Sequence, residues 1–146
     1  MLKFNKQFKE EIGGFSLVEV IVAMSILMIA FIGLVQSFPL GNSVNDSAQK
    51  KTSASYLAQE KIENLYSIGY DNIATGTIEA KHRLSSDKSD FLYKYQRETE
   101  VNYMDENLNV SSSDTGLKRI TTRIYFLNTL TKEEENIIMN TLIGKH

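Results

Sequence analysis

The pattern of polar and apolar positions changes abruptly at Gly14. Residues 1–14 are polar and mix lysines with two glutamates. At about 1.5 Å per residue, a helix covering the apolar run that follows would exceed the roughly 30 Å hydrocarbon layer of a bilayer. This run therefore predicts a tilted transmembrane helix over residues 15–41. Its few polar positions are Ser16, Glu19, Ser25, Gln36 and Ser37.

The short flank before the apolar run is slightly cationic, with Lys3, Lys6 and Lys9. The positive-inside bias then predicts a single-pass protein of the cytoplasmic membrane, with a cytoplasmic N-terminus and an extracytoplasmic body. A secretory signal peptide is the alternative. Its best small-x-small cleavage site, at residues 35–37, is weak, and the run is longer than the usual signal-peptide core. A membrane anchor is therefore favoured.

A second amphipathic segment predicts that the helix resumes over residues 42–68 and ends at Gly69. Its charged residues lie largely outside one apolar stripe, as expected for a helix that covers a core on one side. The stripe consists of Val44, Ala48, Leu57, Ile62 and Leu65, and the charged residues are Lys50, Lys51, Glu60 and Glu63.

Beyond a loop that begins at Tyr70, alternation of apolar and polar residues indicates strands. The polar segment 104–116 is expected to form a hairpin loop, and residues 129–136 to connect the last two strands. The predicted fold is α+β: a long N-terminal helix whose second half packs on a small antiparallel sheet, within an extracytoplasmic body of residues 42–146. The expected strands are 77–84, which has the weakest pattern, 93–103, 118–126 and 137–143.

Composition limits the possible chemistry. The chain has 146 residues and a formal net charge of -2 with both signs interspersed, so no basic face indicates nucleic acid as a partner. It contains no cysteine, which excludes disulfides, thiolate metal sites and a cysteine nucleophile. The body must therefore be stabilised by packing.

Glu19 is the unusual residue of the apolar run, because a carboxylate near the centre of a bilayer costs about 2.5–3.5 kcal/mol. Close to the membrane edge it could be a tolerated interfacial charge. If the chain were cut before Phe15, the new α-amine would lie about 6 Å from Glu19 along a helix. Pairing of amine and carboxylate between neighbouring subunits would fix their axial register.

Pro39 is the second unusual residue of this run, because proline has no N–H to donate to a preceding carbonyl. A helix that continues through it is expected to kink or loosen, helped by Gly33 and Gly41. Alternatively, Pro39 marks the point where the helix leaves the membrane.

Two possible metal sites are weak. The sequence Asp105-x-Asn107-x-Asn109 begins like a calcium loop, but valine follows where glycine is needed, and Gly116 stands where the bidentate glutamate belongs. A solvated loop is the better interpretation. His82 and His146 have no partner at metal-ligand spacing and are expected at the surface.

Other candidate sites also favour structural interpretations. The run Glu133–Glu135 could supply carboxylates, but three neighbours in a turn point in different directions. Four residues, Tyr93, Lys94, Tyr95 and Arg97, could stack on bases and contact phosphates, although sheet packing is favoured. The chain contains no Gly-rich phosphate loop, nucleophile elbow or zinc motif. We therefore expect no enzyme activity, no cofactor and no metal.

The segment Gly14-Phe15-Ser16-Leu17-Val18-Glu19, followed by the uncharged run, resembles the class III signal of type IV prepilins and of type II secretion pseudopilins. The resemblance implies that a membrane aspartyl prepilin peptidase removes leader residues 1–14 by cutting between Gly14 and Phe15. It also implies N-methylation of Phe15. Glu19 matches the glutamate that sets filament register in the family.

A weaker resemblance, in residues 56–65 and 117–120, is to minor pilins and I-type pseudopilins. It implies a minor pilin that moves from the membrane into a type IV pilus on the cell surface. The implied partners are the prepilin peptidase and methyltransferase, other pilin or pseudopilin subunits, an inner-membrane assembly platform and lipid. A pseudopilin of a secretion or DNA-uptake system, and a simple membrane-anchored binding module, are the alternatives.

Overall fold

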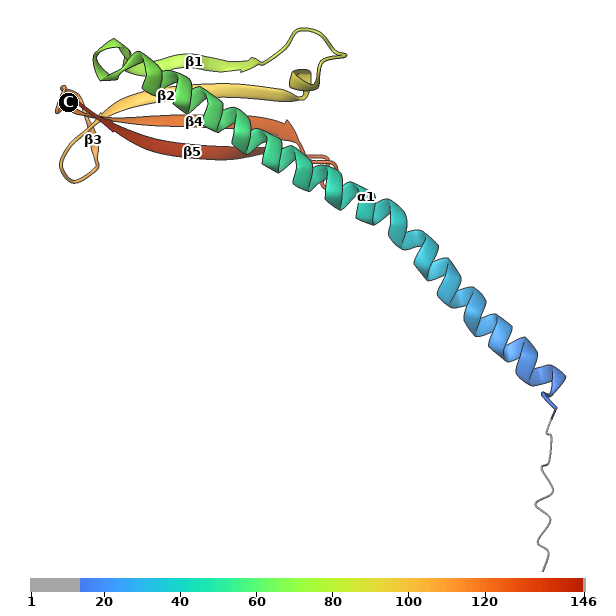
Figure 1. Cartoon of the computed structure of the whole chain (residues 1–146). Coiled ribbons are helices and arrows are strands. Elements are labelled where there is room, and N and C mark those ends of the chain that lie inside the picture. The colour runs from blue at the N-terminus through green and yellow to red at the C-terminus, as the bar shows by residue number, and fades with distance from the viewer. Residues whose placement is uncertain (1–13, 146) are drawn as a thin grey trace, which may run out of the picture. The chain divides into compact units, whose positions relative to one another are not determined.

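In the computed structural model, which describes residues 14–145, one long helix precedes an antiparallel sheet (Figure 1). This confirms the α+β fold predicted from the sequence. The described residues fall into two compact units that meet between Leu40 and Gly41. The elements are helix α1 (Leu17–Ile68), a 3-10 turn (Tyr70–Asn72), β1 (Gly76–Arg83), a second 3-10 turn (Phe91–Lys94), β2 (Tyr95–Met104), β3 (Val110–Ser111), β4 (Leu117–Leu127) and β5 (Glu134–Gly144).

The strands are ordered β1-β2-β4-β5, and the short β3 pairs with β2 outside this path (Figure 1). All pairs are antiparallel. The β4–β5 register runs without interruption from Leu117–Gly144 to Leu127–Glu134. The β1–β2 register is shifted at two places. The two edges of the sheet therefore differ in regularity.

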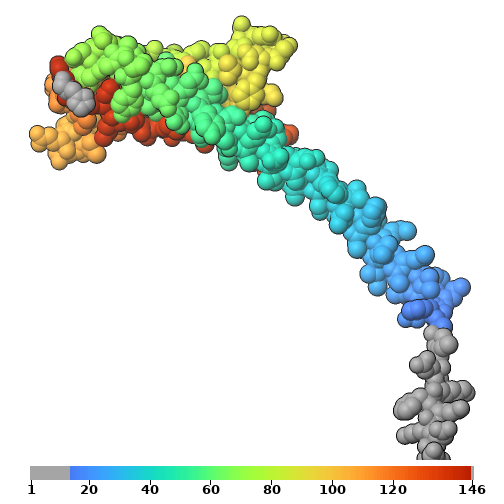
Figure 2. Space-filling view, viewed as in Figure 1, coloured from blue at the N-terminus to red at the C-terminus, as the bar shows by residue number. Residues whose placement is uncertain are grey.

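The second half of α1 packs on one face of this sheet (Figure 2). Small side chains at one level let the helix approach closely: Ala54 and Ala58 are fully buried against Tyr95, Ile124 and Phe126. Larger side chains fill the interface nearer the end of α1. This second cluster consists of Ile62, Leu65, Tyr70, Ile73, Val101, Ile120 and Ile143.

The predicted helix stripe is partly wrong. Ile62 and Leu65 are buried as predicted, but Val44 and Ala48 are exposed. Burial begins instead at Ser47, whose hydroxyl donates to Asn128 Oδ1 at 2.9 Å. The helix face is therefore set by a polar contact and two alanines, which an apolar stripe does not reveal.

Several predicted boundaries also differ from the structure. The predicted loop 104–116 contains β3, and β5 begins at Glu134, so Glu134 and Glu135 are strand residues rather than part of a turn. Tyr93 and Lys94 lie in a 3-10 turn that caps β2 instead of in the strand. The predicted helix end is confirmed, since α1 stops at Ile68 and Gly69 has a φ of 81°.

Candidate functional site

The first candidate site is the apolar part of α1. Every residue from Phe15 to Leu40 is exposed, including its phenylalanines, leucines and isoleucines. The helix is long and apolar enough to cross a membrane. Its exposed apolar surface is far more extensive than single scattered hydrophobic residues, so it requires a cover of lipid or protein.

Two of the polar side chains in this segment are satisfied within the helix itself. The Ser25 hydroxyl donates to the Ile21 carbonyl at 2.8 Å, and the Ser37 hydroxyl donates to the Gly33 carbonyl at 3.0 Å. Bonds to the carbonyl four residues earlier remove the cost of placing these hydroxyls in hydrocarbon. Glu19 remains the one charged side chain between Phe15 and Asn45.

The start of α1 brings together the residues that the sequence singled out. Gly14 and Phe15 precede the helix, and apart from Gly14 and its chain neighbours no described residue lies within 4 Å of the position that a Cβ on Gly14 would take. Phe15 is 82% exposed. Both residues of the Gly14–Phe15 pair are therefore exposed. The leader residues 1–13 and His146 lie outside the described residues.

Glu19 lies in the first turn of α1. The Val20 N–H donates to the Ser16 carbonyl at 3.2 Å, so helical hydrogen bonding begins at Ser16. Ser16 and Glu19 have the three-residue spacing of a capping box, and a negative charge is favoured near the positive end of the helix dipole. The carboxylate is thus compatible with this helix end.

Pro39 lies inside α1, and the helix continues through it to Ile68. Its ring nitrogen has no hydrogen to donate, so one backbone hydrogen bond of the helix is missing there. The division between the two compact units falls directly after the next residue, Leu40. The kink at Pro39 stays a prediction.

Within the body, an ionic cluster links α1 to two strands. Glu79 of β1 lies 3.0 Å from Lys61 Nζ of α1 and 3.0 Å from Arg97 Nη2 of β2, and it accepts a hydrogen bond from Thr99 at 3.0 Å. Burial by itself raises the pKa of Glu79, but hydrogen bonds from Arg97 and Lys61 outweigh it and lower the pKa to about 2. The exposed His82 ring lies 3.3 Å from the same carboxylate.

A buried lysine fixes the turn that follows α1. Lys118 of β4 is only 3% exposed, and its ammonium donates to the Tyr70 carbonyl at 2.8 Å and the Ile73 carbonyl at 2.7 Å. The Tyr70 ring lies 4.2 Å from the same nitrogen. The Tyr70 hydroxyl donates to Asp114, and burial together with this bond raises its pKa to about 12. These contacts are structural and were not foreseen from the sequence.

The calcium-like loop that begins at Asp105 uses the oxygens of this carboxylate for hydrogen bonds within the loop. Asp105 Oδ1 accepts from the backbone N–H groups of Asn107 and Asn109 at 2.9 and 2.8 Å, and Oδ2 accepts from the Asn109 amide at 3.3 Å. The backbone bond from Asn109 is the main cause of a lowered Asp105 pKa. Across residues 14–145, no group of three or more His, Asp or Glu side chains is placed to hold a metal.

The possible stacking surface is divided between different environments. Tyr95 is completely buried under α1, and Arg97 is paired with Glu79 in the helix–sheet interface. Tyr93 instead lies under the Arg83 guanidinium, 4.3 Å from its ring centre. Tyr95 and Arg97 both lie on the face of the sheet that α1 covers, so they are not available for stacking on a ligand, and the sheet-packing interpretation holds for them.

The glutamate run Glu133–Glu135 is divided in the same way. Glu134 pairs with Lys81 of β1 at 2.7 Å, whereas Glu135 pairs with Lys51 of α1 at 3.1 Å. Neighbouring strand residues point to opposite faces of a sheet, which explains the separate partners. The two carboxylates cannot act on one substrate atom.

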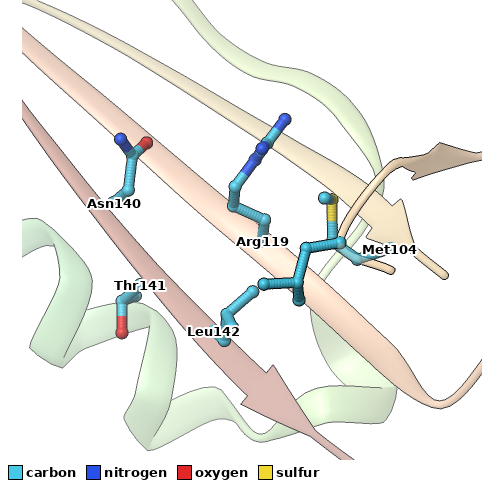
Figure 3. Close-up of a pocket in the computed structure, with 6 residues that line it drawn as sticks. Met104, Arg119, Asn140, Thr141 and Leu142 are labelled. Atoms are coloured by element: carbon cyan, nitrogen blue, oxygen red, sulfur yellow. The ribbon is translucent and has the colours of Figure 1, made fainter. Parts of the chain in front are cut away.

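A hollow of about 330 Å³ lies against β4 and β5 and is lined by Met104, Leu108, Arg119, Asn140, Thr141 and Leu142 (Figure 3). Arg119 and Asn140 extend from one side of the sheet, whereas the Thr141 side chain points the other way (Figure 3). The Arg119 Nε atom is buried and has no hydrogen-bond partner among the described residues.

The geometry thus provides an exposed apolar stretch of α1 with a single carboxylate, and a body with an apolar helix–sheet core and internal ion pairs. Comparison with protein-family models, with curated proteins and with solved structures found no match to this chain.

Proposed function

We propose that the chain is a prepilin-type structural subunit, a minor pilin that assembles into a type IV pilus after removal of leader residues 1–14. One observation supports this most strongly: helix α1 begins at Leu17, just after the Gly14–Phe15 pair, and its apolar stretch up to Leu40 is exposed throughout and contains one charged side chain, Glu19. In the membrane, lipid covers this helix. In a filament, the helices of other subunits replace the lipid.

Cleavage gives Glu19 a role. Removal of the leader leaves an α-amine on Phe15, with an ordinary pKa near 8, beside the first turn of α1. An amine and a carboxylate that enter an apolar bundle unpaired are both costly, so each stabilises the other across a subunit contact. The N-terminal amine of one subunit and Glu19 of its neighbour then set the axial offset between helices.

The body contributes a stable exterior rather than chemistry. Its charged side chains at the helix–sheet interface are paired with one another, as Glu79 is with Lys61 and Arg97. The subunit's partners are the prepilin peptidase and methyltransferase, the assembly platform and other pilins. No enzyme activity is proposed for the chain itself.

A pseudopilin of a type II secretion or DNA-uptake system is the second candidate, favoured by the likeness of residues 56–65 and 117–120 to I-type pseudopilins. Both segments contribute to the helix–sheet interface, with Ile62 and Leu65 from the first and Lys118 and Ile120 from the second. Such packing suits either system. A simple membrane-anchored binding module would use the same span but keep its leader.

The deciding experiment is the intact mass and N-terminal sequence of the protein purified from its native membranes. The proposal predicts a chain that starts at Phe15 and has one additional methyl group. A chain that still starts at Met1 would overturn the proposal in favour of a simple anchor, and a start near Phe38 would indicate a secreted protein.

The role of Glu19 is tested by Glu19→Ala, with Gln36→Ala as a matched control in the same helix. Glu19→Ala should be processed normally but be lost from purified filaments, while Gln36→Ala should be incorporated like the wild type. Immunoblots of membrane and filament fractions measure both. Normal incorporation of Glu19→Ala would refute the register role.

A further inference from the structure

The two edge strands of the sheet differ in how open they are to pairing. The β1 edge is interrupted by two register shifts and bears the charged residues Glu79, Lys81 and Arg83. The β5 edge has an unbroken register, no proline, and no charged residue from Asn136 to Gly144. Irregularity and charge protect edge strands from joining other chains. β1 has this protection along its length, whereas β5 has charged residues only at its start.

Two hydrogen bonds establish which backbone groups of β5 face outward. Asn128 N–H donates to the Glu133 carbonyl at 2.9 Å, and Lys145 N–H donates to the Gly116 carbonyl at 2.8 Å. The backbone N–H and C=O groups of the odd-numbered residues that flank β5 thus point toward β4. Because these groups alternate in direction along an antiparallel strand, the backbone N–H and C=O groups of the even-numbered residues point away from β4, toward the open edge.

A third hydrogen bond and the exposure of two side chains support the assignment of even-numbered backbone groups to the open edge. The Leu142 carbonyl accepts the Tyr66 hydroxyl at 2.5 Å, as an outward carbonyl can, and retains a second lone pair. The side chains of Ile138 and Leu142 are 53% and 42% exposed, on either side of Asn140. The edge therefore combines free backbone groups with uncovered apolar side chains.

We propose that β5 pairs antiparallel with β5 of a second copy of this chain, about a two-fold axis at Asn140. In this register Asn140 lies opposite Asn140, and Ile138 opposite Leu142. Glu135 of each copy then lies opposite Lys145 of the other. Every outward-facing even-numbered residue meets another even-numbered residue, so the free N–H and C=O groups can bond to each other.

Neighbouring registers fit less well. Moving the axis to Met139 places Glu135 opposite Ile143, and Ile138 opposite Asn140. Moving it to Thr141 places Ile137 opposite Lys145, and Leu142 opposite Asn140. Cross-strand pairs stabilise a sheet when like polarity or opposite charge meets. Of these three registers, only the axis at Asn140 places Ile138 opposite Leu142, Ile137 opposite Ile143 and opposite charges at both ends, and its one mixed pair is Met139 with Thr141.

Existing ion pairs do not block this arrangement. Glu135 contacts Lys51, and Lys145 contacts Asp71, at 3.1 Å each. Both Lys51 and Lys145 are at least half exposed, so a charged side chain of the second copy can reach each existing ion pair without breaking it. Confinement of the chains to one membrane raises their local concentration, so that weak edge pairing suffices for a dimer. The pairing concerns the body and does not depend on leader cleavage.

The test uses the absence of native cysteine. Full-length Asn140→Cys, oxidised in membranes, should form a disulfide-linked homodimer, since directly opposed residues of a hydrogen-bonded pair lie about 5.5 Å apart between Cα atoms. Thr77→Cys, exposed on the other edge, is the matched control and should remain monomeric. Ile138→Cys and Leu142→Cys should each give little homodimer alone but crosslink when coexpressed.

Adding Ile138→Lys to Asn140→Cys should lower the dimer yield about tenfold, the effect of roughly 1.4 kcal/mol of lost association energy. Circular dichroism of this variant verifies that the body remains folded. Equal crosslinking of Asn140→Cys and Thr77→Cys, an unchanged yield with Ile138→Lys, or a crosslinked product of another mass would overturn the proposal. The mass of the mature N-terminus is a separate readout, so the failure of one proposal does not imply the failure of the other.

Discussion

The ionic cluster around Glu79 gives the most quantitative prediction. The substitution Glu79→Gln keeps the shape of the side chain but removes its charge, leaving Lys61 and Arg97 with only 22% and 17% of their side chains exposed and without their shared partner. Two partly buried cations beside each other are unfavourable. We therefore expect the variant to fold with markedly lower stability.

The magnitude follows from the pKa of Glu79, which is lowered from its ordinary value of 4.5 to about 2. At roughly 1.4 kcal/mol for each tenfold change in proton affinity, this corresponds to about 3 kcal/mol. Because the folded-state pKa is the lower one, this stability is fully present above pH 4.5. It is lost as the pH falls toward 2 and the folded carboxylate takes up a proton.

The assay is thermal or denaturant unfolding of the full-length chain in non-ionic detergent, followed by near-UV circular dichroism of the body's tyrosines. The wild type should exceed Glu79→Gln by about 3 kcal/mol at pH 7, and the difference should shrink between pH 4.5 and 2. Glu60→Gln, exposed on the same helix, should behave like the wild type. A difference below about 1 kcal/mol, the size of an exposed ion pair, would refute the reasoning, as would one that persists at pH 2.

Two further predictions concern the turn after α1. Lys118→Met removes the lysine donor from the buried Ile73 carbonyl and leaves the Tyr70 carbonyl with only the 3.4 Å bond from the Ile73 N–H, so it should cost about 1–3 kcal/mol, the penalty of one unsatisfied buried group. An unchanged melting temperature would contradict a structural role for this lysine. Gly69→Ala forces a Cβ into a backbone with φ of 81° and should cost about 1–2 kcal/mol. Ser67→Ala, on the same turn, is its control, and equal melting temperatures for the two variants would disprove the strain.

Much of the fold could be predicted from the sequence, because its signals are local. Alternation located all four long strands, and uninterrupted apolarity located the first half of α1. The two-residue strand β3 was missed because Val110 and Ser111 lie in a polar segment with no alternation to detect. The start of β5 was missed because Glu134 and Glu135 resemble a solvated turn, while their partners, Lys81 and Lys51, are distant in sequence.

The residues of the candidate sites also differ in whether local sequence could reveal them. Gly14, Phe15 and Glu19 belong to one short segment of the sequence, so the sequence alone could single them out, and the roles proposed for them stay predictions. The Glu79 cluster and the Lys118 clamp join residues from separate elements, and a lone charged residue in a strand gives no sign of what it meets. The β5 edge became recognisable only when the strand order placed it at the border of the sheet.

The packing of α1 has a consequence for how the chain acquires its structure during synthesis. The helix emerges first, but the residues that bury Ala54 and Ala58, namely Tyr95, Ile124 and Phe126, are made much later. Contacts so distant in sequence form slowly, because a long loop must close before they contribute. Because Ile143 of β5 also belongs to the core, the body cannot complete its core until β5 has been made, and until then the nascent helix exposes an apolar face that invites aggregation or chaperone binding.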